Sequence, residues 1–557
     1  MSVPVLVLNF GHSVLRSLSD YTQAASEIYR HYAKGYNIVA VTSAQGDQTD
    51  VLMAEARRIG PGDEAKNLAE LICLGEKRSA ALLALALERV GAPAYVRQAR
   101  DLGLRADGTG ANARLVDLNV EQLLLDLKNH DIVVMPGFVA IGDNDRPALL
   151  GQGGADLTAL YVAQKLGTRA LLLKDIDGVY QHDPKREGDA PLRFGAISHA
   201  DMESLNKGLI APRALAFAKK NGQNIELGKP GSPFVTEIGG KTASPTAPHH
   251  ARILRVAMLG CGTVGGGVYR RMNENKDRFD CVKIMVRNVK KYTDQGMKAD
   301  LLTTKFEDLL AAKPDVFIDV SGGIEPALSQ TRAMLAAGVH VVSANKQAVA
   351  AGGAVLDQFA VDHNAMLEVS GTAGGGMPVL EMCKRERGRI TRVDALLNGT
   401  TNFMLDNISA GMDYDAALKL AQDKGFAEAD PSGDVDGSDA AAKIRLIARY
   451  GFSKEITLDD ISRDTIDGFS AAKFNGRAKR VASCWVDETG EFHTALRLMD
   501  LQKDDFLAQA EGEEAHAVFT FDDGSQYRIR GKGAGRWPTT EAVMEDLYTI
   551  SAEIAFS

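Results

Sequence analysis

The sequence has no long apolar stretch and no excess of one charge. None of its apolar runs approaches the ~18 residues that a membrane-spanning helix requires. Met1 and Ser2 lead straight into VPVLVLNF, without the basic residues that open a signal peptide. The formal net charge of −9 is spread along the chain, which argues against nucleic acid or an anionic membrane as a partner. We therefore expect a cytoplasmic protein that acts on a small molecule.

Cysteine is also scarce, and its placement excludes two kinds of site. The five cysteines are odd in number, scattered, and never paired as CxxC (Cys73, Cys261, Cys281, Cys383 and Cys484). This usage suits a reducing compartment and argues against a disulfide framework or a thiolate metal site. A Walker A sequence is missing too, which excludes a P-loop kinase.

The length of 557 residues predicts two to four domains. The clearest break is the small, polar, proline-bearing segment 239–250, which is typical of a linker. On both sides of it, short apolar runs alternate with helical patterns, so both halves are predicted to be α/β. The halves are not copies of each other, because their glycine motifs differ.

A dinucleotide site is predicted directly after the linker. The apolar run 253–259 is followed by a GxGxxG motif, a helical pattern to Met272 and a second strand at 282–286. GxGxxG alone is weak evidence, but this strand–turn–helix context is the one that binds a pyrophosphate at a helix N-terminus. The candidate cofactor residues are those of the motif: Gly260, Gly262, Thr263, Val264 and Gly265.

The residues after the second strand indicate NADP, or the use of either nicotinamide with NADP bound at least as well as NAD. NAD-specific sites place an acidic residue there to bind the ribose hydroxyls. Here Arg287 and Lys290 follow the strand, with Lys291 beside them, and the first carboxylate is Asp294. A guanidinium could bind a 2′-phosphate, although solvated loop cations would look the same in a sequence.

Two further strands end in polar residues, at the sheet edge where α/β proteins bind ligands. Strand 315–320 runs into Ser321 and Gly322, and strand 340–346 ends in Asn345 and Lys346. Lys346 could contact the substrate or the nicotinamide, or it could be an ordinary surface lysine.

The stretch GFAEADPSGDVDGSDAAAK, residues 425–443, carries the chemically most informative pattern. A glycine- and proline-bearing loop rich in carboxylates precedes a helix on which Asp439 and Lys443 share one face. Such a pair is usually a solvated surface pair. A calcium loop is the second alternative, but Lys443 falls where that loop needs a bidentate glutamate. As an active site, the carboxylates would bind a substrate ammonium, and the lysine would transfer a proton.

The ordered motifs GCGTVG, SGG, SANK, GGGMP, NGTTN, AEADPSGDVDGSDAAAK and GKGAG resemble homoserine dehydrogenase over residues 252–557. The resemblance implies NAD(P)H-dependent interconversion of L-aspartate 4-semialdehyde and L-homoserine, in threonine, methionine and isoleucine biosynthesis. It also implies a homodimer or higher homo-oligomer. The fold implied is a Rossmann-type domain with an inserted α/β catalytic and dimerisation domain, after which the chain returns to the cofactor domain.

The resemblance assigns a role to each motif. Lys443, helped by Asp439, would protonate the forming alkoxide, and Lys346 would face the substrate across the nicotinamide. The remaining positions would bind substrate (Glu428, Asp434, Asn398, Gly399, Thr400) or border the cofactor (Ser321, Gly322, Ala344, Asn345, Gly533, Gly535). A monovalent cation would bind the carbonyls of Ala373, Gly375 and Met377. The glutamate that completes this site in the family falls on Ser370, with Glu368 two residues earlier on the same strand face.

The N-terminal half resembles aspartate kinase of the amino-acid-kinase fold. The loop GQGGADLT (151–158) and the segment KDIDGVY (174–180) are similar to that family, which is fused to homoserine dehydrogenase in some organisms. Here the phosphate-binding lysine is replaced by Asn9 and the carboxylate-binding arginine by Gln152. Phosphoryl transfer depends on positioned charge, so we expect a domain without aspartate kinase activity. The ACT-type modules that usually follow the kinase are replaced by a short linker.

These observations define the expected domains and three functional alternatives. The domains are a kinase-like unit at 1–240, a linker at 241–251, a cofactor domain at 252–385, a catalytic domain at 386–525 and a returning segment at 526–557. The main hypothesis is a homoserine dehydrogenase with an inactive kinase-like domain. The alternatives are a bifunctional aspartokinase–homoserine dehydrogenase with an unusual kinase site, and a non-catalytic nucleotide sensor.

Overall fold

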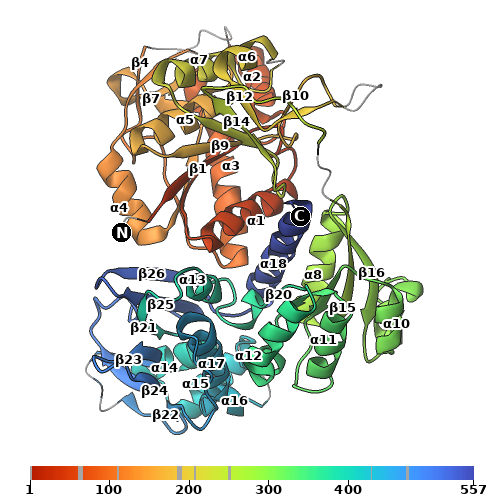
Figure 1. Ribbon diagram of the computed structural model, residues 1–557. Coiled ribbons are helices and arrows are strands. Elements are labelled where there is room, and N and C mark those ends of the chain that lie inside the picture. The colour runs from red at the N-terminus through yellow and green to blue at the C-terminus, as the bar shows by residue number, and fades with distance from the viewer. Residues whose placement is uncertain are drawn as a thin grey trace. The chain divides into compact units, whose positions relative to one another are not determined.

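The computed structural model describes residues 3–60, 67–108, 112–184, 191–205, 208–248, 252–427, 430–471, 474 and 476–556 (Figure 1). The chain forms two compact units, residues 1–89 with 93–250, and residues 90–92 with 251–557. Both units are α/β, which confirms the predicted fold class. Among the helices described, none is long and apolar enough to cross a membrane.

The first unit is built on an eight-stranded sheet in the order β12-β14-β13-β9-β1-β2-β6-β3. Its strands are parallel except where β14 pairs antiparallel with β13. The strand bounds are β1 (Val5–Phe10), β2 (Asn37–Thr42), β3 (Ala94–Val96), β6 (Ile132–Pro136), β9 (Arg169–Leu173), β12 (Ala196–Ser198), β13 (Ile225–Gly228) and β14 (Val235–Gly239). Strands β2 and β6 are buried along their whole length, as expected for a parallel sheet covered on both faces.

Helices cover this sheet, and smaller sheets flank it (Figure 1). The helices are α1 (Asp20–Ala33), α2 (Gln48–Ile59), α3 (Leu68–Val90), α4 (Val120–His130), α5 (Gly154–Leu166), α6 (His199–Leu205) and α7 (Pro212–Asn221). One smaller sheet has the order β5-β4-β7-β8, and β10 pairs with β11. Their bounds are β4 (Arg105–Asp107), β5 (Arg114–Asp117), β7 (Val139–Ile141), β8 (Pro147–Leu149), β10 (Val179–Tyr180) and β11 (Arg193–Phe194).

The second unit begins with a six-stranded, fully parallel sheet in the order β17-β16-β15-β18-β19-β20. This is the strand order of a dinucleotide-binding Rossmann fold. Its strands are β15 (Leu254–Leu259), β16 (Phe279–Met285), β17 (Leu302–Thr303), β18 (Val316–Asp319), β19 (His340–Ser343) and β20 (Leu367–Glu368). Its helices are α8 (Thr263–Glu274), α9 (Val289–Thr293), α10 (Phe306–Ala311), α11 (Ala327–Ala336) and α12 (Lys346–Asp362).

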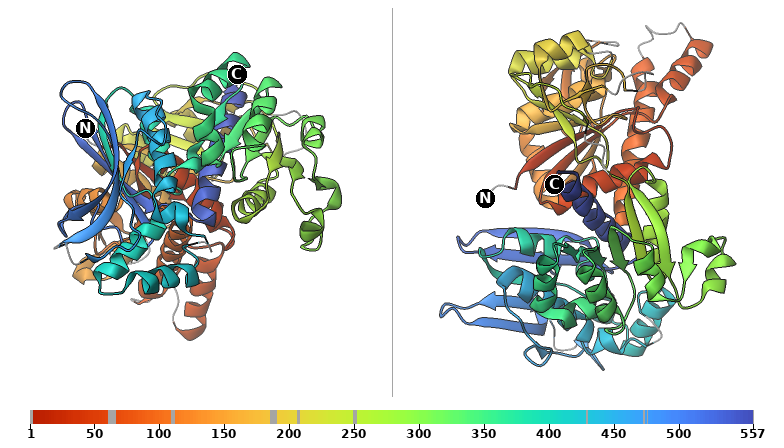
Figure 2. Two further views of the ribbon diagram at one scale, coloured as in Figure 1. Left: turned by 90° about the horizontal axis from the view of Figure 1, so that it is seen from below. Right: turned by 45° about the vertical axis from the view of Figure 1, so that its right-hand side comes forward.

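The C-terminal helix α18 (Arg536–Phe556) returns to this Rossmann sheet (Figure 2). Val543 and Leu547 of α18 share one hydrophobic core with Val268 of α8 and Met258 of β15. The catalytic domain is therefore an insertion, as the family resemblance implies.

The inserted domain places helices on an antiparallel sheet of order β22-β24-β23-β21-β25-β26, in which only β22 and β24 are parallel. The strands are β21 (Ile390–Ala395), β22 (Ser462–Arg463), β23 (Arg477–Val486), β24 (Phe492–Leu501), β25 (Glu514–Phe521) and β26 (Gln526–Lys532). The helices are α13 (Val379–Arg385), α14 (Gly399–Ser409), α15 (Tyr414–Asp423), α16 (Ser432–Val435) and α17 (Ser438–Phe452). The stretch predicted as a loop thus contains the one-turn helix α16, and Gly437 rather than a side chain caps α17.

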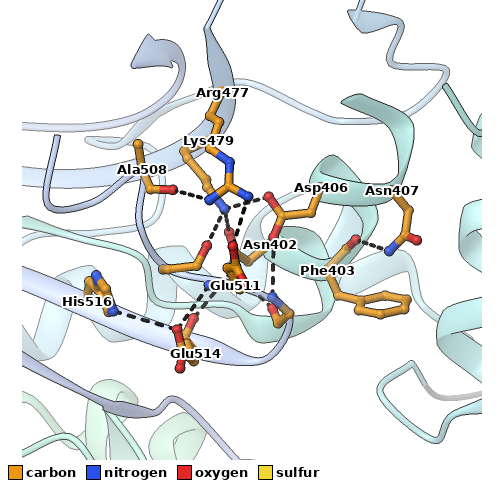
Figure 3. A network of polar contacts seen from close by, with 12 residues as sticks. Asn402, Phe403, Asp406, Asn407, Arg477, Lys479, Ala508, Glu511, Glu514 and His516 are labelled. Carbon is orange, nitrogen blue, oxygen red and sulfur yellow. Dashed lines mark hydrogen bonds and ion pairs between the residues drawn. The ribbon is translucent and has the colours of Figure 1, made fainter. Parts of the chain in front are cut away.

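A buried lysine fixes α14 to this sheet (Figure 3). Lys479 of β23 is fully buried and donates to Asn402 Oδ1 at 2.6 Å, Asp406 Oδ1 at 2.7 Å and the Ala510 carbonyl at 2.7 Å. Burial lowers the pKa of Lys479, and the carboxylate of Asp406 opposes that shift. All three acceptors are needed, because a buried ammonium without partners is strongly unfavourable.

Replacement of Lys479 should therefore destabilise the second unit. In Lys479→Met, Asp406 loses its cation, and we expect a loss of about 3 kcal/mol, near the low end for a broken buried pair because Asp406 is partly exposed. Tryptophan fluorescence during urea unfolding measures this unit alone, since Trp485 and Trp537 are the only tryptophans of the chain. The matched control is Lys419→Met, which removes an exposed i,i+4 pair and should leave the midpoint unchanged. Equal midpoints for the two variants would contradict the assignment.

Candidate active site

The glycine turn between β15 and α8 has the geometry that a bound pyrophosphate requires. Gly260 has φ +96°, and a Cβ there would lie 3.0 Å from the Val320 carbonyl oxygen. A Cβ on Gly265 would lie 2.6 Å from the Gly260 carbonyl oxygen, so only glycine lets the helix approach the strand. Gly262 faces open space and caps α8, whose first residues are Thr263 and Val264. The exposed N–H groups at this helix start can bind an anion.

The ends of β18 and β19 are tied together beside this turn. Asn345 Nδ2 donates to Ser321 Oγ at 3.3 Å and to the Gly323 carbonyl at 2.9 Å, while its Oδ1 caps α12. Burial raises the pKa of Asp319, against the hydrogen bonds that it accepts from Ser321. The structure therefore brings together the four residues predicted from SGG and SANK: Ser321, Gly322, Ala344 and Asn345.

Two groups of cations lie near the glycine turn. Arg287, Lys290 and Lys291 are exposed after β16, where Asn288 caps α9. The sequence interpretation missed Arg536 at the start of α18, whose Nη2 lies 3.8 Å from the position of a Cβ on Gly266. Its position directly after GKGAG is the signal that could have identified it. Gly533 lies instead against the turn at Gly375, and Gly535 has φ +113°.

Asp439 lies between two lysines from different domains. Its carboxylate bonds Lys443 Nζ of α17 at 2.9 Å and pairs with Lys346 Nζ at the start of α12. Burial raises the pKa of Asp439, but the two ammonium groups outweigh it and hold the pKa well below its usual range. Lys443 is buried and also donates to the Leu397 carbonyl at 2.6 Å. The i,i+4 pair is therefore not a solvated surface pair.

Asn398 connects this triad to the acidic stretch. Its Nδ2 donates to Asp434 Oδ1 at 2.6 Å and to Asp439 Oδ2 at 3.1 Å. Asn398 also caps α14, which begins at Gly399, and Thr400 Oγ1 donates to the Phe426 carbonyl at 2.7 Å. Glu428, the other predicted substrate carboxylate, lies outside the described residues.

Arg480 of β23 is a second residue that the sequence interpretation missed. Its guanidinium donates to the Val435 carbonyl at 2.7 Å, to Thr401 Oγ1 at 2.9 Å and to the Asp434 carbonyl. Its strand, RAKRVASCWV, also carries Arg477 and Lys479, so the sequence offered no signal that singled out Arg480. The structure shows that Arg480 carries its charge inward.

The residues at the predicted cation position do not fit the arrangement implied by the family. Ser370 stands in place of the glutamate, and its backbone N–H donates to Asp546 Oδ2 at 3.0 Å. Glu368, the nearest alternative ligand on that strand, pairs with Lys384 Nζ at 2.6 Å. Neither position therefore offers a free carboxylate to a cation at the turn through Ala373, Gly375 and Met377.

In the first unit, the kinase-like residues meet at the ends of β1 and β9. Asn9 is fully buried, and its Nδ2 donates to Asp156 Oδ1 at 2.6 Å. Lys174, just after β9, bonds both oxygens of the same carboxylate at 2.8 and 3.0 Å. One positive charge therefore lies beside Asn9, although it is paired with Asp156. Gln152 is exposed in the glycine loop before α5.

Comparison with known proteins agrees with this geometry. The model of the homoserine dehydrogenase NAD binding domain matches residues 260–369, and the homoserine dehydrogenase model matches residues 378–548. The amino acid kinase family model matches residues 4–228.

Curated relatives and a solved structure cover the second unit. Homoserine dehydrogenase of Synechocystis sp. is 33% identical over 324 residues, which are 55% of this chain and 75% of the relative. The Bacillus subtilis enzyme is 31% identical, over 54% of this chain and 73% of its own. The crystal structure of a homoserine dehydrogenase from Thiobacillus denitrificans superposes with a TM-score of 0.51 at 27% identity, covering 55% of this chain and 75% of that one. The chain is thus an oxidoreductase with a nicotinamide-binding domain and an N-terminal amino acid kinase domain, and it belongs to the homoserine dehydrogenase family.

Proposed function

We propose that Lys443 is the proton donor and acceptor for the interconversion of L-aspartate 4-semialdehyde and L-homoserine. The observation that carries this proposal is the Lys443–Asp439–Lys346 triad, in which Lys443 is buried and Asp439 is largely buried. Asp439 and the Leu397 carbonyl fix Lys443 Nζ at one place, as an acid–base group requires. Lys346 belongs to the cofactor domain, so it is the lysine of the triad that comes nearest to the nicotinamide side of the site.

The residues of the chain perform every step except hydride transfer. The nicotinamide, when bound, supplies the hydride to the aldehyde carbon or accepts it from homoserine. During reduction, Lys443 Nζ gives a proton to the carbonyl oxygen, which becomes the hydroxyl of homoserine, and the lysine is then reprotonated by solvent. Asp434, with Glu428, binds the substrate ammonium, and Asn398 holds the Asp434 carboxylate in place. Gly399 and Thr400 continue the same helix start.

Removal of the proton donor should slow turnover far more than binding. We expect Lys443→Ala to lower kcat by about 10²–10⁴-fold, the usual effect of losing a positioned general acid. The KM for homoserine should change less, because the ammonium-binding carboxylates remain. Steady-state kinetics of homoserine oxidation measure both, with the exposed Lys454→Ala as control. Near-native kcat in Lys443→Ala would show that another group transfers the proton.

We propose that the preferred cofactor is NADP. The site fits a dinucleotide, since Gly260, Gly262 and Gly265 leave the backbone accessible at the start of α8. Exposed cations at Arg287, Lys290 and Lys291 follow β16, the strand after which Rossmann sites bind the adenosine ribose, and Arg536 lies near the glycine turn. A guanidinium binds a 2′-phosphate through two parallel hydrogen bonds, which ribose hydroxyls cannot offer.

Arg287→Ala should therefore weaken NADP selectively. We expect kcat/KM for NADP to fall by about tenfold or more, as the loss of a charge-assisted hydrogen bond predicts, and kcat/KM for NAD to change little. Both values of kcat/KM are measured at equal ionic strength, with Lys276→Ala, an exposed lysine just beyond the C-terminal end of α8, as control. A tenfold or greater preference for NAD in the parent enzyme, unchanged by Arg287→Ala, would defeat the proposal.

We propose that the kinase-like unit lacks aspartate kinase activity. Gln152 cannot make the bidentate contact with a carboxylate that an arginine makes, and Asn9 is neutral where the kinase needs a cation. The alternative is a bifunctional enzyme with an unusual kinase site. One observation favours it, because Lys174 places an ammonium beside Asn9.

An assay of the whole chain separates these two possibilities. Aspartate-dependent ATP consumption, measured as aspartyl hydroxamate and as ADP, should be absent or far below the ~1–100 s⁻¹ of ordinary kinases. Homoserine oxidation in the same preparation shows that the protein is folded. An ordinary kinase rate that is lost in Lys174→Ala would establish the bifunctional alternative.

We also propose that the enzyme acts in the cytoplasm as a homodimer or a higher homo-oligomer, as the family resemblance implies. Acid and base are mixed along the chain, in agreement with a partner set limited to small molecules and other copies of the chain.

A further inference from the structure

Arg480 links two parts of the active site that are distant in the sequence. The arginine is 5% exposed, and its guanidinium reaches α14 through Thr401 and the acidic stretch through the carbonyls of Asp434 and Val435. Gly437 provides the space, since a Cβ there would lie 3.4 Å from Arg480 Nη1 and 2.6 Å from Leu496 Cδ2. With φ +83°, position 437 also disfavours any other residue.

These contacts close a ring of hydrogen bonds around Asp434. Thr401 Oγ1 accepts from Arg480 and donates to Asn398 Oδ1 at 2.5 Å. Asn398 Nδ2 donates to the Asp434 carboxylate, and Arg480 donates to the Asp434 carbonyl. The side chain and the backbone of Asp434 are therefore both held. An aspartate whose side chain and backbone are both held keeps its carboxylate in position when a ligand binds. Less ordering is then needed on binding, so the free-energy cost of binding is lower.

Charge supports the same interpretation. Burial lowers the pKa of Arg480 to about 10, against the attraction of Asp434, Asp436 and Asp439, so the guanidinium is charged at neutral pH. The positive charge of Arg480 compensates the negative charge of these carboxylates. Its hydrogen bonds go to two backbone carbonyls and to the Thr401 hydroxyl. A lysine could not replace it, because the three acceptors are reached from two separate nitrogens of a planar guanidinium, a geometry that one ammonium nitrogen does not have.

We propose that Arg480 is a positioning residue that sets the selectivity of the enzyme for substrates with an α-amino group. It acts by holding Asp434 where the substrate ammonium binds. The inference rests on the proposed role of Asp434, and it deepens that proposal. A residue needed only for stability would reduce the activity toward every substrate in parallel.

The test compares L-homoserine with 4-hydroxybutanoate, which has the same hydroxyl and carboxylate but no amino group. In Arg480→Lys and Arg480→Met, we expect the KM for homoserine to rise by about 10–100-fold, as loss of hydrogen bonds around a charged group predicts. The kcat/KM for 4-hydroxybutanoate and the KM for NADP should change less than about threefold, so the preference for homoserine falls. Thr401→Val, which removes one acceptor of the ring, should lower the preference in the same direction by less.

Arg477→Met is the matched control. Arg477 lies three residues away on the same strand and donates to the Ala508 carbonyl at 2.8 Å, outside the ring (Figure 3). The preference of the Arg477→Met variant for homoserine should equal that of the parent enzyme. The inference would be overturned if the Arg480 variants kept the parent preference for homoserine. It would also be overturned if they lost activity toward both substrates in parallel. If Arg480→Met does not fold, an unchanged preference in both Arg480→Lys and Thr401→Val has the same meaning.

Asp434→Asn distinguishes the two levels of the proposal. If it lowers the preference for homoserine while the Arg480 variants do not, only the role of Arg480 is wrong. If Asp434→Asn leaves the preference unchanged, the ammonium-binding role of Asp434 is wrong, and the inference about Arg480 fails with it.

Discussion

The proposed active site depends on one largely buried carboxylate, Asp439, held between the ammonium groups of Lys443 and Lys346. A carboxylate removed from water is costly unless it is paired, and here two cations together lower its pKa far below the usual value. Lys443 comes from the catalytic domain and Lys346 from the cofactor domain, so the same interaction aligns the two domains. The loss of either lysine would leave a buried charge with half of its compensation.

Two consecutive residues of one strand of the catalytic sheet support this triad. Lys479 and Arg480 of β23 both direct a buried cation toward α14, where Lys479 bonds Asn402 and Asp406, and Arg480 bonds Thr401. The start of α14 carries Asn398, which reaches Asp434 and Asp439. Two inward-facing cations on a strand are expensive to bury, and each of them donates three hydrogen bonds here. The strand therefore fixes the position of the helix that orients the acidic residues.

The kinase-like unit keeps the fold of its family, while two positions that carry a cation in aspartate kinase are Asn9 and Gln152 here. The parallel sheet and the glycine loop before α5 are present, but Asn9 and Lys174 converge on Asp156. The ammonium group of Lys174 reaches the site from the end of β9, and it forms an ion pair with the Asp156 carboxylate. Membership of a fold therefore does not decide activity, which depends on individual positions such as Gln152.

The sequence by itself determined the α/β class, the Rossmann motif and its family, because periodic apolar runs, glycine turns and Asp439–Lys443 spacing are local properties. It also placed Lys443 and Asp439 on one helical face, which needs only the 3.6-residue repeat. The partner of Asp439 from another segment, Lys346, and the partners of Asp434 could not be read in the same way. Lys346, Arg480 and Arg536 reach the site from segments far apart in the chain, and a cation in a sequence looks the same whether it is solvated or buried. Only the tertiary structure decided which of these charges are paired, because pairing depends on burial and on distances between segments that no local pattern encodes.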